Sequence, residues 1–139
     1  MSPFNFLNTS VKSYLRKSTI RGIGLFALVD IKKDENVFPV WEGDTDWYSL
    51  SVIQFTKLPK EVGAYILRSY VNDLSTSYAL VKFRLVKDTN FLFSEPLALL
   101  NTAFEQGNVD SETGIALKNI RKNQELTGNY TLSSQIKMI

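Results

Sequence analysis

One internal repeat constrains this chain more than any other feature of its sequence. Residues 26–37 (FALVDIKKDENV) return as residues 115–126 (IALKNIRKNQEL) in nearly the same register. Each copy is typical of a short strand, a polar turn rich in Asp, Asn and Lys, and the start of another strand. The copies lie too far apart for a stacked solenoid, and nothing similar stands between them. Similar turns need similar residues, but two copies in one register predict a fold that uses this device twice.

The rest of the chain is also rich in predicted strands. Short strands are expected over residues 11–15, 37–41 and 81–85, the last with clear alternation of apolar and basic residues. Pro59 suits the first turn of a helix over residues 60–70, and residues 94–100 could form one short turn. We therefore predict a mainly β, β-rich α+β domain with one good helix, and not a doubly wound parallel sheet.

No linker, proline run or low-complexity tract divides the 139 residues. That length suits one domain with its own hydrophobic core. We expect a single domain over residues 1–139, with its core at about residues 12–130 and a short tail at 131–139.

Composition excludes several kinds of chemistry. The chain contains no cysteine and no histidine, so thiolate nucleophiles, imidazole bases and thiolate or imidazole zinc sites are ruled out, and we predict no metal site. Catalysis would have to rest on Tyr, Lys, Asp, Glu, Ser, Thr or the backbone.

Charge and hydropathy favour neither nucleic acid nor membrane as a partner. The net charge is only +2, and the two basic clusters, which are typical of solvated faces, are Lys12, Arg16, Lys17 and Arg21, and Lys118, Arg121 and Lys122. The longest strongly apolar run, residues 97–100, is far too short to span a bilayer, and the first residues lack the features of a signal peptide. We expect a cytoplasmic protein.

Residues 21–27 (RGIGLFA) place two glycines around one residue. Such a turn leaves backbone amides and carbonyls open to a ligand. It also fits the loose dinucleotide pattern G-x-G-x-x-A, with Glu42 and Asp44 near the distance of a ribose-binding acid. The flanks argue against that site, because residues 12–19 are too polar for a buried parallel strand and the turn at residues 32–36 interrupts any following helix. A plain glycine turn between two strands stays open.

Three segments together resemble the SET-domain family. Gly22 to Glu35 is similar to its motif G-x-G-L-F-A followed by D-I-x-K-x-E, and two later motifs have partial counterparts in order: Leu100, Asn101, Asn108 and Val109, then residues 116–130 ending ELTGNY. The resemblance covers roughly residues 12–130, with a variable middle. No cysteine triplet follows Tyr130, so the chain looks like the compact stand-alone SET proteins of viruses and bacteria.

The resemblance implies a fold, a cofactor and a set of site residues. The fold would be small twisted sheets with the C-terminal segment threaded beneath a loop, which is rare in proteins. This threading would bring Asn101, Asn108 and Tyr130 beside the glycine turn, and Asn108 would help to form the pocket. S-adenosyl-L-methionine would bind there, with Tyr130 as the catalytic residue and as cofactor contacts Arg21, Gly22, Ile23, Gly24, Phe93, Asn101, Thr102 and Tyr130. For Phe93 a role as a core aromatic is an alternative.

The sequence departs from the family pattern at several positions. Thr102, Ala103 and Phe104 stand where the family has His, Ser and Cys, Asn129 replaces the usual aspartate, and the turn glycine is missing at Asn123 and Gln124. Loss of the histidine could loosen the threaded core, because a shorter hydroxyl would replace a side chain bonded to buried backbone.

The implied activity is methyl transfer to the side-chain amine of a protein lysine. That reaction needs a neutral amine aligned with the methyl group and shielded from water, which a tyrosine hydroxyl and backbone carbonyls can arrange. A lysine-bearing protein or peptide would be the partner, and the tail or a second subunit, as in a homodimer, would close the channel. The alternative is a catalytically degenerate SET-fold binding or scaffolding module.

Overall fold

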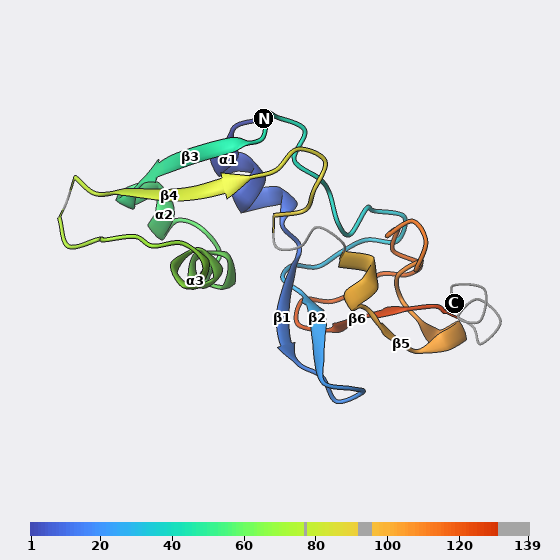
Figure 1. Cartoon of the computed structure of the whole chain (residues 1–139). Coiled ribbons are helices and arrows are strands. Elements are labelled where there is room, and N and C mark those ends of the chain that lie inside the picture. Colours follow the sequence, from blue (N-terminus) through green and yellow to red (C-terminus); the bar gives the residue numbers. More distant parts are fainter. Residues whose placement is uncertain (77, 92–95, 131–139) are drawn as a thin grey trace. The chain divides into compact units, whose positions relative to one another are not determined.

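The computed structural model describes residues 1–76, 78–91 and 96–130, excluding the side chain of Ala98. The chain divides into two compact units (Figure 1). Unit 1 comprises Met1–Val11 and Pro39–Ser94, and unit 2 comprises Lys12–Phe38 and Glu95–Ile139. Short strands in two sheets predominate, with few helices, which confirms the prediction of a β-rich α+β fold.

Unit 2 contains a mixed four-stranded sheet. Its spatial order is β1 (Ser13–Lys17), β2 (Ile23–Ala27), β6 (Glu125–Gly128) and β5 (Asn101–Thr102). β1 and β2 form an antiparallel hairpin, β6 is antiparallel to β2, and β5 is parallel to β6. The sheet thus joins the first strands of the unit to its last one (Figure 1).

The two copies of the repeat lie antiparallel to each other beside this sheet. Ile31 and Ile120, which occupy equivalent positions, exchange both backbone hydrogen bonds at 2.8 and 2.7 Å. Each remaining bond between the copies also has a symmetry mate. The Ala27 N–H donates to the Gln124 carbonyl, as the Ala116 N–H does to the Glu35 carbonyl. The Asn123 N–H donates to the Ala27 carbonyl, as the Asp34 N–H does to the Ala116 carbonyl. The Lys122 N–H donates to the Asp30 carboxylate, as the Lys33 N–H does to the Asn119 amide oxygen. The repeat is therefore a local pseudo-twofold pair.

Unit 1 is built on an antiparallel hairpin of β3 (Asp46–Ser51) and β4 (Leu80–Leu85). Three helices accompany it, α1 (Pro3–Asn5), α2 (Val52–Thr56) and α3 (Lys60–Ser69), and a π-helical turn η1 (Phe6–Ser10) follows α1. β4 and α3 match the predicted strand and helix, and Pro59 is the N-cap of α3.

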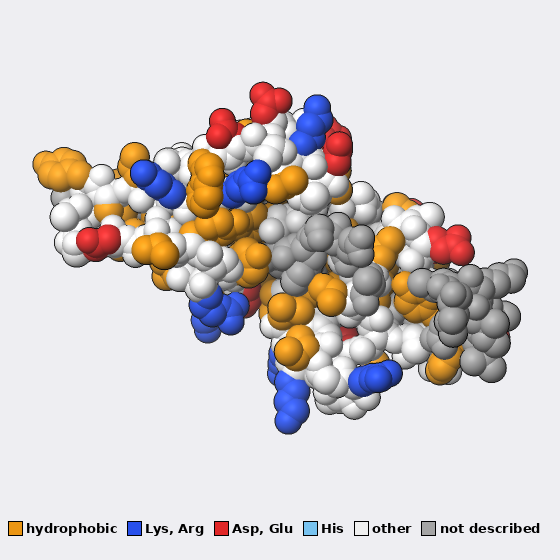
Figure 2. Space-filling view, in the orientation of Figure 1, with side chains coloured by type: hydrophobic (Ala, Val, Ile, Leu, Met, Phe, Trp, Pro, Cys, Tyr) orange, Lys and Arg blue, Asp and Glu red, His pale blue; other side chains and the backbone are white. Residues whose placement is uncertain are grey.

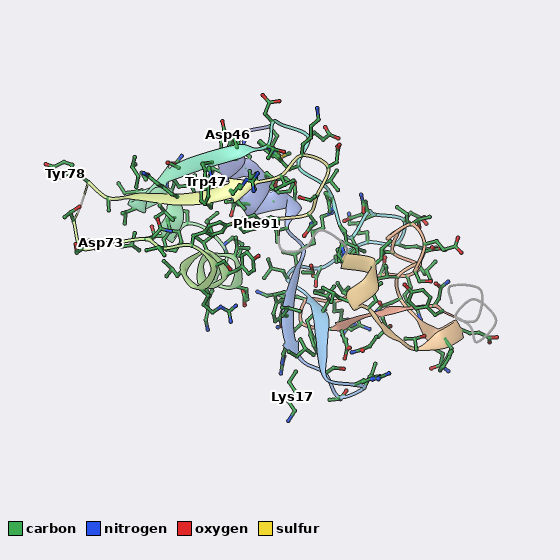
Figure 3. The ribbon with its side chains drawn as sticks, in the orientation of Figure 1. Lys17, Asp46, Trp47, Asp73, Tyr78 and Phe91 are labelled. Carbon is green, nitrogen blue, oxygen red and sulfur yellow. The ribbon has the colours of Figure 1, made fainter. Side chains whose placement is uncertain are left out.

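The core of unit 1 contains a cluster of aromatic rings. Alternate residues of β4 are buried, and the Phe91 ring lies 6.1 Å from that of Phe83 on β4 and 5.2 Å from that of Tyr65 on α3. Trp47 of β3 (Figure 3) is 60% exposed and packs edge-on against Tyr70, whose ring stacks on that of Phe91. The core of unit 1 combines this ring cluster with aliphatic residues, among them Val62 and Ile66 of α3.

Two strand predictions need correction. The strand expected over residues 11–15 begins at Ser13, because the helical stretch at the N-terminus continues to Ser10. The strand expected over residues 37–41 does not form. Pro39 has no backbone N–H, so this segment cannot supply a continuous ladder of hydrogen bonds.

The described part of residues 94–100 is a 3₁₀ turn, η2 (Pro96–Leu99), as predicted, and a second one, η3 (Phe104–Gln106), follows β5. No helix in the described part of the chain is long and apolar enough to cross a bilayer. The same residues contain no group of three or more acidic side chains that could hold a metal ion.

Candidate cofactor site

The glycine turn connects β1 to β2 at one end of unit 2. The Ser18 N–H donates to the Gly22 carbonyl at 2.8 Å, which closes the turn, and Gly22 has a left-handed φ of +51°. A Cβ at Gly22 would meet nothing within 4 Å, so open space surrounds this part of the backbone. Arg21 and Ile23 are exposed, Ile23 at 66%. The turn therefore presents open space beside Gly22 and two exposed apolar side chains, Ile20 and Ile23, to a ligand.

Asn101 begins β5 and reaches back to this turn. Its side-chain Nδ2 donates to the Arg21 carbonyl at 3.0 Å and to Oε2 of Glu125 at 2.9 Å. Parallel pairing of β5 with β6 fixes the backbone of Asn101 opposite Thr127, which aims the amide at the turn. The predicted juxtaposition of Asn101 with residues 21–24 is thus present within unit 2.

Glu125 is a member of this cluster that we did not select from the sequence. Its carboxylate lies between Asn101 and Ser18, whose Oγ is 2.8 and 2.9 Å from the two carboxylate oxygens. A Cβ at Gly24 would overlap Oε2 of Glu125, so a side chain there would force the carboxylate to shift. The repeat could have indicated this position, because Glu125 stands where the first copy has the neutral Asn36.

Ser18 is the second residue that the sequence did not single out. Its Oγ donates to Glu125 and accepts the N–H groups of Ile20 at 2.9 Å and Arg21 at 3.2 Å. The hydroxyl is largely buried, at 9% residue exposure. A chain of hydrogen bonds thus runs from β6 through Ser18 into the exposed turn.

The segment that contains β6 is hydrogen-bonded on both sides. The Thr127 carbonyl accepts the N–H groups of Asn108 and Val109, whereas the carbonyl of the next residue, Gly128, accepts the Ala103 N–H on the other side. A Cβ at Gly107 would overlap the backbone of Gly128, so the chains pass very close there. This arrangement is the one expected for a C-terminal segment threaded through the preceding stretch.

Asn108 holds this segment with its side chain. The amide donates to the Glu125 carbonyl at 2.9 Å and accepts the Thr127 N–H at 2.8 Å, and the residue is buried at 4% exposure. Both ends of the side chain are therefore bonded to the backbone of β6. Asn108 shapes the site by fixing the strand that carries Glu125.

Thr102 replaces the family histidine and keeps a bond to the threaded segment. Its Oγ1 donates to the Tyr130 carbonyl at 3.2 Å and accepts the Phe104 N–H at 3.1 Å. The hydroxyl is thus used to hold backbone. Its geometry favours a role in placing Tyr130.

Tyr130 lies two residues after the end of β6. Its hydroxyl donates to the Leu97 carbonyl at 3.3 Å, and its ring lies against Gly128, where a Cβ would be 3.2 Å from two ring carbons. No hydrogen bond among the described residues joins Tyr130 to the glycine turn. The structure therefore places Tyr130 at the end of the threaded segment but not in hydrogen-bonding contact with Arg21 or Gly24.

The other departures from the family pattern also make hydrogen bonds in unit 2. Asn129 accepts the N–H and the hydroxyl of Ser111, both at 2.9 Å. Asn123 has a left-handed φ of 71°, which asparagine tolerates better than most residues, and it accepts the Tyr14 hydroxyl at 2.9 Å. Phe93 lies outside the described residues, so its predicted contact has no structural counterpart.

Positive charge surrounds the turn without forming one large patch. Lys17 extends from the end of β1, Arg16 lies 5.4 Å from the centre of the Phe26 ring, and Arg21 is exposed (Figure 3). On the face shown in Figure 2, the basic side chains are scattered among neutral and apolar ones. Glu125 forms no ion pair among the described residues, so the groups that hydrogen-bond its carboxylate there are neutral donors.

Comparison of the sequence with family models gives no match, and no curated protein matches it. Several solved structures are similar to it at low identity. One is a candidate histone methyltransferase of Plasmodium falciparum, 20% identical, with a TM-score of 0.37 over 87% of this chain and 94% of that chain. Another is the Chaetomium thermophilum Polycomb Repressive Complex 2 bound to GSK126, 21% identical, with a TM-score of 0.40.

The second match covers 94% of this chain and 17% of that chain, so this chain spans about a sixth of that neighbour. A humanized mutant of the same complex bound to GSK126 is 22% identical, with a TM-score of 0.36 over 85% of this chain and 14% of that chain. Likenesses of this size do not carry an activity over to this chain.

Proposed function

We propose that this chain is a SET-type methyltransferase that takes a methyl group from S-adenosyl-L-methionine and places it on a lysine side chain of a protein or peptide. The observation that carries the proposal is the meeting of three segments within unit 2. Asn101, between the other two in sequence, bonds both the Arg21 carbonyl and the Glu125 carboxylate. These are the segments whose motifs resemble the family in the sequence.

The turn and Asn101 fit the proposed cofactor. Gly22 has open space around its backbone, Ile23 offers an exposed apolar surface, and the Asn101 amide is held in one orientation by two acceptors. The backbone of residues 21–24, Asn101 and Thr102 would hold the cofactor, and Phe93 would add a ring. When bound, S-adenosyl-L-methionine supplies an electrophilic methyl group on a positively charged sulfur.

Tyr130 is the proposed catalytic residue. Its only hydroxyl proton is donated to the Leu97 carbonyl, so the oxygen lone pairs remain able to accept a hydrogen bond from an amine. An amine held in this way would be aligned for attack, and neighbouring carbonyls would exclude other orientations. Thr102 supports this role by fixing the Tyr130 backbone.

Titration of the folded protein with S-adenosyl-L-methionine and with its demethylated product tests cofactor binding. We expect both to bind. Failure of both at millimolar concentration would overturn the proposal, because that limit corresponds to only about −4 kcal/mol. Mass spectrometry of candidate proteins incubated with enzyme and cofactor then tests transfer to lysine and counts the methyl groups added.

The alternative is a SET-fold binding module without turnover. The departures Thr102 and Asn129 favour it, because they stand where the family pattern has histidine and aspartate. A folded protein that ignores the cofactor would support the module. We further propose that the protein acts in the cytoplasm, as a monomer or a homodimer, and binds neither nucleic acid nor membrane.

A further inference from the structure

Glu125 occupies a place in unit 2 that the proposed reaction does not itself explain. It is the one residue whose carboxylate is hydrogen-bonded to both the β1–β2 turn and β5 among the described residues. Its main chain is fixed independently, because the Glu125 carbonyl accepts the Asn108 amide at 2.9 Å. The carboxylate is therefore held at a defined point between two segments that are far apart in sequence.

Each partner of the carboxylate is itself hydrogen-bonded to the backbone of the turn. On one side, Ser18 donates to the carboxylate, which leaves the Ser18 lone pairs to accept the N–H groups of Ile20 and Arg21. On the other side, Asn101 donates one hydrogen to the carboxylate and one to the Arg21 carbonyl. Both routes end on the backbone of Arg21, at its N–H and at its carbonyl.

A carboxylate suits this position because both partners are donors. Ser18 and Asn101 both donate toward position 125, and a carboxylate is a pure acceptor with two oxygens. A glutamine could accept both donors only with its oxygen at the Oε2 position, and its NH₂ would then lie 2.8 Å from Ser18 Oγ, which already accepts two N–H groups. The site thus uses both oxygens of Glu125 as acceptors.

We propose that Glu125 is the positioning residue of the cofactor site, and that its carboxylate orders the 18–24 turn and orients the Asn101 amide before any ligand binds. This inference rests on the proposed function for the identity of the ligand. Glu125 acts through Ser18 and Asn101 and needs no contact of its own with the cofactor. Gly24 belongs to the same hydrogen-bonded arrangement, because a side chain there would displace the carboxylate.

The test compares Glu125→Gln with Ser18→Ala and with Glu112→Gln. Glu112 is an exposed carboxylate of the same unit whose side chain makes no hydrogen bond among the described residues, so its variant controls for the change in charge. In the protein without ligand, we expect faster amide hydrogen exchange at Ile20 and Arg21 in the Glu125 and Ser18 variants and unchanged exchange in the Glu112 variant. Unchanged exchange in the Glu125→Gln variant would overturn the proposal.

Titration gives the second readout. We expect Glu125→Gln to bind S-adenosyl-L-methionine and its neutral demethylated product roughly 5- to 100-fold more weakly, by similar factors, as for one buried hydrogen-bonding group left unsatisfied. A loss confined to the positively charged cofactor would mean that Glu125 acts by charge attraction, and would overturn the positioning role. If Glu125→Gln does not fold, Glu125→Asp, which withdraws the carboxylate from Ser18 and Asn101 by one methylene group, carries both measurements.

These outcomes separate the inference from the proposed function. Wild-type protein that binds neither ligand would refute the proposed function, while the exchange rates at Ile20 and Arg21 would still decide whether Glu125 orders the turn. Wild-type binding with unaltered binding by both variants would leave the proposed function intact and refute the role of Glu125.

Discussion

Asp34 and Asn123 occupy equivalent positions of the two repeat copies and have the same left-handed backbone conformation, with φ of 73° and 71°. Each donates its N–H to the alanine at the start of the other copy, Asp34 to Ala116 and Asn123 to Ala27. The side chains differ in use. Asn123 accepts the Tyr14 hydroxyl, whereas the Asp34 side chain makes no hydrogen bond among the described residues.

This difference predicts unequal effects of glycine at the two positions. Asp34→Gly should raise the free energy of unfolding by up to about 1 kcal/mol, because glycine adopts positive φ without the steric penalty of a Cβ. Asn123→Gly should gain less, since it also loses the bond to Tyr14. Chemical denaturation of both variants measures the difference. Lys33→Gly and Lys122→Gly, one residue earlier at ordinary φ, are the matched controls and should be neutral or destabilising.

Asn101→Ala should weaken cofactor binding. The substitution leaves the Arg21 carbonyl without the Asn101 donor and removes one donor from Glu125, at a cost of about 1–3 kcal/mol. Calorimetric titration measures the loss. Asn119→Ala is the control, because it removes a unit 2 amide that is hydrogen-bonded to backbone, accepting the Lys33 N–H, but has no bond to the turn. Equal affinity in folded Asn101→Ala and wild type would show that Asn101 is not a cofactor contact.

Tyr130→Phe should remove most methyl transfer and leave cofactor binding and the fold largely intact. Only the hydroxyl is deleted, together with its bond to Leu97, so the packing of the ring on Gly128 remains. Loss of one preorganised hydrogen-bonding group should reduce the rate on the order of 10²–10³-fold. Single-turnover methylation at saturating cofactor measures the rate, and thermal unfolding reports the structure.

A purely structural role for the hydroxyl would lower the melting temperature along with the rate. Equal rates in the two proteins would remove Tyr130 from the mechanism. Tyr65, Tyr70 and Tyr78 would then become the candidates.

The ion pair between Lys12 and Glu35 should make part of the stability depend on pH. The Nζ–Oε2 distance is 3.1 Å, and this hydrogen bond lowers the pKa of Glu35 below its ordinary value of 4.5. A lowered folded-state pKa means that the contribution is fully present above the unfolded pKa and is lost as pH falls through the folded value. Glu35→Gln should therefore be less stable than wild type at pH 7, by up to about 1 kcal/mol for a partly exposed surface pair.

The difference between the two proteins should shrink as pH falls below 4.5 and vanish once Glu35 is protonated in both states. Denaturation curves collected from neutral to acidic pH measure it. A constant difference across that range would mean that the substitution acts through something other than the ionised carboxylate.

Gly22→Ala and Gly24→Ala should impair the protein in different ways, the first by lowering stability and the second by weakening cofactor binding. At Gly22 the added Cβ has open space but a φ of +51°, so we expect a stability cost of about 1 kcal/mol. At Gly24 the Cβ meets the Glu125 carboxylate and approaches the Asn101 amide to 3.2 Å, so cofactor affinity should fall. Parallel measurements of unfolding and of binding separate the two effects, and an opposite assignment would contradict this account.

The sequence predicted the elements that have a clear local spacing of apolar residues. The alternation in residues 81–85 and the apolar spacing after Pro59 gave β4 and α3 nearly to the residue. The repeat was also visible, because its turns need residues that tolerate left-handed φ. By contrast, β3 and α2 were missed, since Asp46–Ser51 has no strict alternation and a five-residue helix offers little periodicity.

The candidate site was predictable only in part, because its key bonds join distant segments. The resemblance identified Asn101 and the turn as site residues but gave no role to Glu125 or Ser18. The hydrogen bonds that join these two residues to each other span 107 residues of sequence. Nothing local marks Ser18 as a buried acceptor in an otherwise polar stretch. The strand expected at residues 37–41 failed for the reverse reason, since an apolar run was given more weight than the proline within it.

Because β6 is hydrogen-bonded on both sides to segments that precede it in sequence, the fold of unit 2 can be completed only after β6 has been synthesised. Its parallel partner β5 and the Asn108–Val109 segment precede it, and its antiparallel partner β2 is near the start of unit 2. A chain emerging from the ribosome therefore displays β2 and β5 with open edges until residues 125–130 have also emerged. Such non-local pairing is slow to form. During synthesis the nascent chain would be a substrate for chaperones before it could be a ligand-binding protein, and its aggregation should depend on the rate of translation.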